Sequence, residues 1–118
     1  MVKSPAIYRG LFAMSSFTVR VELHGASGAQ YDALHDAMER NGFYRAIEGV
    51  GGDGVSWVYA MPTAEYDHVS QATCVAVRDA ALRIASSVKS TPEPWVFVTE
   101  ANNRAWTSKI IRSAQQAA

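Results

Sequence analysis

Three polar side chains alternate with apolar ones near the start of the chain, and their types could support phosphodiester chemistry. They are Arg20, Glu22 and His24, within the stretch 17–24. Strict alternation is the period of a β-strand, so we expect these three side chains on one face. The other face then holds the apolar row of Phe17, Val19, Val21 and Leu23.

A carboxylate and an imidazole can act as base and acid while a 2′-hydroxyl attacks the neighbouring phosphate of RNA. An arginine can stabilise the charge that develops in the transition state. Glu22, His24 and Arg20 are therefore candidate catalytic residues for RNA cleavage without a metal. The alternative is an exposed row of charges that pairs with charges on neighbouring strands.

Further basic and aromatic residues could hold RNA if the fold brings them beside that row. Aromatic rings stack on unpaired bases, and cationic side chains pair with phosphates. The candidate RNA-binding residues are Arg45, Trp57, Tyr59, Arg104, Trp106 and Lys109. The alternative for Trp57 and Tyr59, which fall in a strand pattern, is a place in the core or in a dimer interface.

Composition narrows the classes of function. The chain has 118 residues, 48% of them hydrophobic, which is enough for one domain with one core. Eleven basic residues balance eleven acidic ones, so no overall field attracts nucleic acid or an anionic membrane. RNA binding would therefore depend on a local patch. The single cysteine, Cys74, excludes an internal disulfide and fits a reducing cytoplasm.

No motif in the sequence indicates a cofactor. The glycine-rich stretch 49–54 lacks the lysine and the following helix of a nucleotide-binding loop. Glu65, Asp67 and His68 are the nearest approach to a metal-ligand set, but their spacing is not distinctive, so we expect no metal. No apolar run approaches the roughly 18 to 20 residues of a membrane span, so we expect no membrane insertion.

The order of the elements predicts an α+β fold. Strands are expected at 17–24, 43–48, 55–61 and 95–100, and amphipathic helices at 29–41 and 70–88. Pro62 ends the third strand, and residues 63–68 are expected to form a connection. Residues 105–111 form either a short fifth strand or an extended tail.

The order β-α-β-β-α-β is the ferredoxin-like motif. It implies a four-stranded antiparallel sheet with strands one and three in the centre and both helices on one face. The polar row of the first strand would then lie on the open face. We expect this domain at 14–112, with a flexible arm at 1–13 and a tail at 113–118.

Four short groups of residues carry a resemblance to a known family, and they span about residues 17–106. They are the stretch 17–24, Tyr31 with 34–38 and 42–43, the stretch 61–66, and 98–100 with 104–106. On these residues the chain resembles the GhoS-type endoribonuclease antitoxins of type V toxin–antitoxin systems. The resemblance implies a ferredoxin-like domain that cuts the messenger RNA of a small membrane toxin. The candidate site residues above come from residue types and spacing, not from the family.

The sequence therefore predicts a small cytoplasmic protein that binds or cleaves RNA, with a toxin messenger as the RNA that the resemblance implies. The alternative is a non-enzymatic interaction module that forms a homodimer, or binds another protein, through the open face of the sheet.

Overall fold

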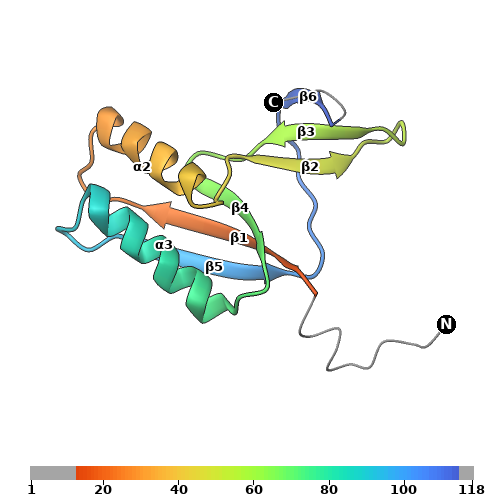
Figure 1. The fold of residues 1–118 in the computed structure, drawn as a ribbon. Helices are drawn as coiled ribbons and strands as arrows, with labels where there is room; N and C mark the ends of the chain where they lie inside the picture. The colour runs from red at the N-terminus through yellow and green to blue at the C-terminus, as the bar shows by residue number, and fades with distance from the viewer. Residues whose placement is uncertain (1–12, 115–118) are drawn as a thin grey trace.

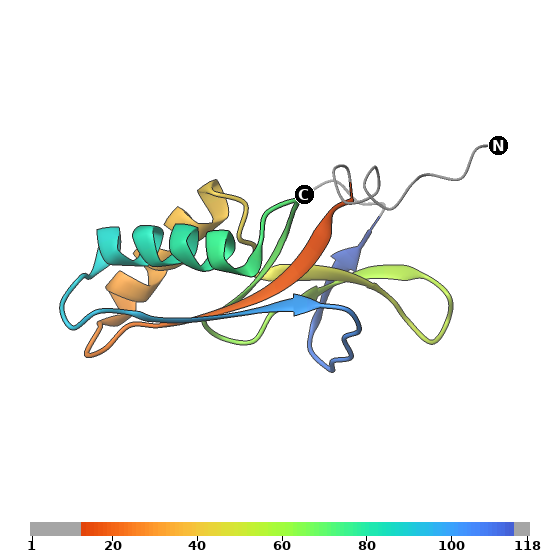
Figure 2. The ribbon, with the colours of Figure 1, turned by 90° about the horizontal axis from the view of Figure 1, so that it is seen from below.

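The computed structural model describes residues 13–114 and places two helices and six strands in that range (Figure 1). One antiparallel sheet consists of β1 (Ser15–Glu22), β4 (Glu65–Ser70) and β5 (Trp95–Ala101). Its order is β4-β1-β5, so the first strand is central, as predicted. The helices are α2 (Gly28–Arg40) and α3 (Cys74–Val88). Both cover the same face of this sheet and leave the other face bare (Figure 2).

The expected single four-stranded sheet is wrong. A second antiparallel sheet, in the order β2-β3-β6, consists of β2 (Ala46–Val50), β3 (Ser56–Ala60) and β6 (Ile110–Ser113). An isolated β-bridge connects the two sheets, where Tyr44 and Asp67 exchange backbone hydrogen bonds of 2.9 and 2.7 Å. The fold is thus α+β, but the third strand lies in the centre of its own sheet and not beside β1.

Residues 61–64 explain why the sheet divides. Pro62 has no N–H to donate to a ladder, which ends β3 as predicted. Ala64 has a positive φ of 64°, and the N–H of Glu65 donates to the carbonyl of Pro62 at 3.0 Å. This turn changes the direction of the chain between β3 and β4. The expected connection at 63–68 is therefore wrong, because Glu65 begins a strand that pairs with β1.

The apolar row of β1 forms the centre of the core, as predicted, with Phe17 and Val19 fully buried. Strand β1 ends two residues earlier than expected. The backbone N–H and carbonyl of Leu23 bond to the hydroxyl of Tyr31, and not to a neighbouring strand. The remaining buried members of this core are Val21, Leu23, Leu34, Met38, Phe43, Tyr66, Val77, Ala81 and Ala85.

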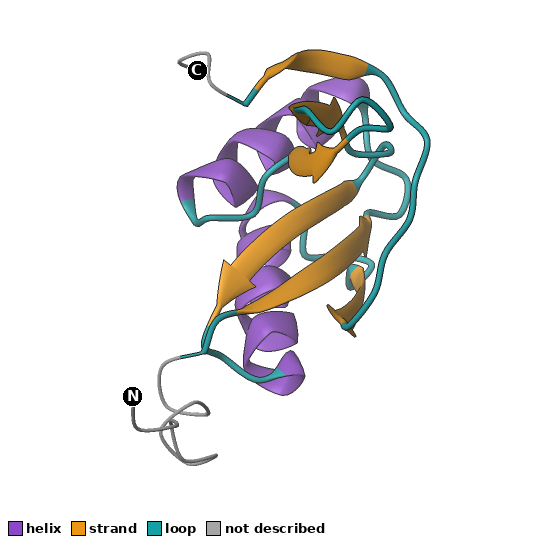
Figure 3. Cartoon of the chain, turned by 90° about the vertical axis from the view of Figure 1, so that its right-hand side faces the viewer, coloured by secondary structure: helices purple, strands orange, loops and turns teal. Residues whose placement is uncertain are grey.

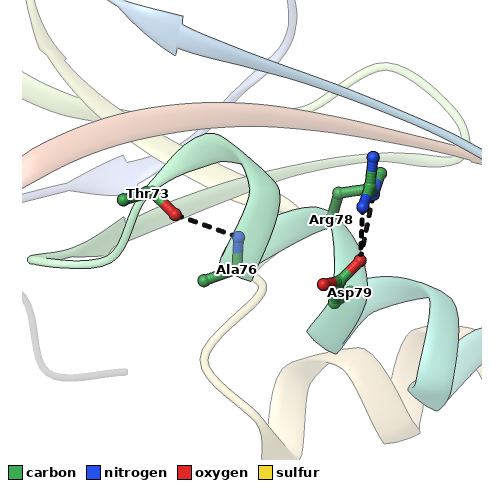
Figure 4. A network of polar contacts seen from close by, with 4 residues as sticks. All are labelled: Thr73, Ala76, Arg78 and Asp79. Carbon is green, nitrogen blue, oxygen red and sulfur yellow. Dashed lines mark hydrogen bonds and ion pairs between the residues drawn. The ribbon is translucent and has the colours of Figure 1, made fainter.

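The helix boundaries follow their caps. Ser27 caps α2 through a capping box with Gln30, and Gly42, with φ of 84°, follows its last turn, as predicted. Helix α3 begins four residues later than expected, because Thr73 is its cap and accepts from the N–H of Ala76 at 3.1 Å (Figure 4). The exposed ion pair of Arg78 and Asp79 in the same view adds little stability.

Residues 102–109 connect the two sheets, and we call them the crossing segment. They form the long loop between β5 and β6 in Figures 1 and 3. Residues 105–111 were expected to form a short fifth strand or an extended tail, and only the last two of them belong to β6. The predicted arm at 1–13 and tail at 113–118 lie outside the described residues, apart from residues 13, 113 and 114. Within residues 13–114 no helix has the length and apolar character needed to cross a membrane.

Candidate functional site

The uncovered face of the first sheet carries the polar row of β1. Directly opposite residues of paired strands point to the same side, so the strand register identifies which side chains share this face. We call this surface the open face, and its residues are Ser16, Thr18, Arg20, Glu22, Glu65, Asp67, Val69, Trp95, Phe97, Thr99 and Ala101. Arg20 and Glu22 are exposed there, in the expected position.

Two aromatic rings dominate the open face. Trp95 is 67% exposed and lies opposite Glu22, while Phe97 is 71% exposed and lies opposite Arg20. With Val96 these four residues line a groove of about 570 Å³. Neither ring stands out in the sequence as a site residue, because Trp95, Val96, Phe97 and Val98 are all apolar. Their pattern alone does not tell which face is buried. The register with β1 decides it, since Val96 and Val98 pack against the core.

Glu22 and His24 meet at one end of the open face. His24 lies in the turn after β1, and its Nδ1 is 3.5 Å from Oε2 of Glu22. Its ring packs edge-on against Trp95, with centroids 4.6 Å apart. The other ring nitrogen, Nε2, is buried and has no hydrogen-bond partner in the described residues. The pair thus has the right composition for acid–base chemistry, but Nε2 would reach a substrate only if the ring turned.

Arg104 reaches the other end of the same face from the crossing segment. Its Nη1 donates to Oδ1 of Asp67 at 3.0 Å and to Oγ1 of Thr18 at 3.1 Å. The open face and Arg104 together hold two cations, Arg20 and Arg104, and three carboxylates. The surface therefore has no excess of positive charge, and phosphate attraction alone would not hold RNA on it.

The predicted aromatic candidates gather elsewhere. Trp57 and Tyr59 lie on β3, in the second sheet, and both are half-buried. Tyr59 packs edge-on against Trp106, with centroids 5.7 Å apart. Lys109 is exposed just before β6, and its carbonyl accepts from the N–H of Ala60 at 2.8 Å. The structure thus brings none of these four side chains into the open face.

Arg45 also lies away from the open face, beside a polar contact at the edge of the core. The hydroxyl of Tyr66 and Nδ1 of His35 are 2.7 Å apart. Burial raises the pKa of Tyr66 to about 12. Burial, and then the charge of Arg45, lower the pKa of His35. We therefore assign the hydroxyl of Tyr66 as the donor and the neutral ring of His35 as the acceptor.

The residues closest to a metal-ligand pattern in the sequence are Glu65, Asp67 and His68. In the structure their side chains bind other groups or lie on another face. Asp67 binds Arg104, as above, while His68 bonds through Nδ1 to the carbonyl of Gly42 and stacks on Phe43. Glu65 lies on the open face. Within residues 13–114 no three His, Cys, Asp or Glu side chains gather in an arrangement that could hold a metal ion.

Comparison with protein-family models, with curated proteins and with solved structures found no match for this chain. The resemblance to the GhoS-type antitoxins therefore stays a prediction from the residues that carry it.

Proposed function

We propose that this protein binds single-stranded RNA across the open face, with two bases stacked on Trp95 and Phe97. The exposure of these two rings on one sheet face carries the proposal. Every base has a flat π surface, so exposed aromatic rings on a sheet are a general platform for unpaired nucleotides. Arg20, opposite Phe97, supplies a cation for one phosphate.

Substitution of the two rings tests this proposal. A labelled single-stranded RNA of about 10 nucleotides falls within the usual site sizes of such surfaces. One stacked base contributes about 1–3 kcal/mol, so Trp95→Ala or Phe97→Ala is expected to weaken binding about 5- to 150-fold in fluorescence anisotropy. Because few phosphates are neutralised, the affinity should depend only weakly on salt.

Trp57→Ala is the matched control, since it removes a tryptophan from the second sheet. We expect this variant to keep the affinity of the wild type. An equal loss in Trp57→Ala and Trp95→Ala would contradict the assignment of binding to the open face. Absence of binding by the wild type at low salt would contradict the function itself.

We further propose that Glu22 and His24 cleave the bound RNA, with the 2′-hydroxyl as nucleophile and Arg20 as the stabilising cation. This step requires the His24 ring to turn, because its Nε2 is shielded from solvent. The resemblance to the GhoS-type antitoxins supports it, and it implies a toxin messenger in the cytoplasm as the target.

Cleavage is tested on a denaturing gel in the presence of EDTA. Loss of one acid–base group is expected to slow cleavage about 10²- to 10⁴-fold in Glu22→Gln or His24→Ala. A substrate with a 2′-deoxy nucleotide at the cut position should not be cleaved. Undiminished cleavage in both variants would remove these residues from the mechanism and leave the binding proposal intact.

The same exposed rings also favour a second function, a non-enzymatic interaction module. Large exposed apolar surfaces often mark contacts between proteins. Strand β5 is moreover an edge strand of its sheet, so its outer backbone groups could pair with another chain. The oligomeric state of the protein tests the homodimer form of this function.

A further inference from the structure

A cavity of about 420 Å³ lies between the two sheets and is closed on one side by the crossing segment. Its volume falls within the range of small-molecule sites, about 300–1,000 Å³. Its walls combine apolar side chains with a few polar groups, the usual composition of such sites. Its lining includes Ile47, Met61, Glu65, Arg104, Trp106 and Ser108.

The cavity carries one negative charge without a close counter-ion. The charge of Arg104 is matched by Asp67, at 3.0 Å. Glu65 has no hydrogen bond or ion pair through its carboxylate in the described part of the chain. Arg20 lies opposite Glu65 on β1, but the two side chains form no ion pair within 4.0 Å. A cation in the cavity could therefore form an ion pair with the carboxylate of Glu65, which has no other partner in the described residues.

Two further features favour a ligand with an apolar body and N–H donors. The hydroxyl of Ser108 is buried and has no partner in residues 13–114. A buried hydroxyl without a hydrogen bond is costly, and a ligand N–H could satisfy it. The ring of Trp106 is held in place by contact with Tyr59, so it offers a fixed wall for an apolar group or a cation.

We propose that this cavity binds a small organic cation, a primary amine with an apolar body. The ammonium group lies against the carboxylate of Glu65 and donates a second hydrogen bond to Ser108, whose hydroxyl is shielded from solvent and must rotate toward the ligand. The apolar body packs on Ile47, Met61 and the ring of Trp106. This site does not depend on RNA binding, since it uses neither Trp95 nor Phe97.

A titration followed by ¹⁵N–¹H NMR tests the proposal with three probes of similar size and different charge. The probes are phenethylamine, phenylacetate and 2-phenylethanol. We expect saturable shifts of the crossing-segment amides and of the Trp106 indole with the amine. The alcohol should bind more weakly, and the anion should not bind. Equal shifts with all three probes, or none with the amine, would overturn the proposal.

Variants of the polar groups locate the binding. Glu65→Gln should weaken amine binding at least about tenfold, the effect of losing one charge-assisted hydrogen bond. Ser108→Ala tests the same cavity at a second position and should weaken binding less. Glu48→Gln is the matched control, because Glu48 is exposed on β2 outside this cavity. Equal affinities in Glu65→Gln and Glu48→Gln would place the amine elsewhere and overturn the assignment.

Discussion

His35 and Tyr66 share a hydrogen bond of 2.7 Å at the edge of the core, and burial shifts the pKa of both side chains. For His35 the folded state holds the proton less tightly than the unfolded state, whose pKa is near 6.5. As the pH falls below 6.5, the unfolded state gains its proton first. Stability contributed by this residue is therefore complete above pH 6.5 and is lost as the pH falls toward the lower pKa of the folded state.

Urea denaturation at about pH 7.5 and about pH 5.5 checks this expectation. When the pH is lowered from the higher to the lower value, the free energy of unfolding should fall more in the wild type than in His35→Gln. The variant has no side chain at this position that takes up a proton. His24 and His68 are present in both proteins and serve as internal controls. An identical pH dependence in the two proteins would contradict the role of His35.

For Tyr66 we expect the protein to lose stability at high pH. Its pKa of about 12 in the folded state lies above the ordinary value of 10.0, so the unfolded state loses its proton first as the pH rises above 10. Tyr66→Phe should remove this loss while keeping the ring in the core.

At the scale of elements, the crossing segment holds the two sheets together through two side chains. Arg104 bonds to Thr18 of β1 and Asp67 of β4, in the first sheet. Trp106 packs on Tyr59 and over Gly49, in the second. A Cβ atom at Gly49 would lie only 2.6 Å from the Trp106 ring, so this ring position requires glycine there.

Gly49→Ala is therefore expected to destabilise the protein by about 1–3 kcal/mol, the usual cost of overpacking. The measurement is chemical denaturation within a double-mutant cycle. In a Trp106→Ala background the cost of Gly49→Ala should largely disappear, because the clashing ring is gone. Gly52→Ala is the matched control, since a Cβ atom there has no neighbour within 4 Å. An unchanged cost in the Trp106→Ala background would contradict the proposed contact.

Some helices and strands can be predicted from the local sequence pattern and others cannot. Helices α2 and α3 and strand β1 follow from periodicity and from caps such as Ser27. Strand β4 cannot be predicted in this way. Its one large buried residue, Tyr66, stands among the polar residues Glu65, Asp67 and His68, so no apolar alternation is visible. Its pairing with β1 makes it a strand, and pairing between residues distant in sequence leaves no local signal.

At the scale of the whole molecule, solution size distinguishes RNA binding from self-association. An aromatic side chain buries about 150–250 Å², so the exposed parts of Trp95 and Phe97 offer about 300 Å² per protomer. A stable dimer usually buries about 1,200–2,000 Å² in total. The two rings therefore supply about half of the smallest stable interface, and we expect a monomer.

Sedimentation equilibrium checks this at protein concentrations of about 100 μM, where even weak dimers with micromolar dissociation constants are populated. A single species at the mass of one chain is expected. A dimer that dissociates in Trp95→Ala would contradict the expectation and favour the interaction module, because the open face would then be the dimer interface.

By itself, the sequence determined the core row and polar row of β1, the two helices, and the end of β3 before Pro62, because periodicity, caps and proline act over a few residues. Only the tertiary structure decided which partner each strand has. It divided the expected sheet at residues 61–64, moved Trp57 and Tyr59 into a second sheet, and placed Trp95 and Phe97 beside Arg20. Strand pairing joins residues far apart in the chain, so alternation indicates two faces but does not tell which neighbours share them.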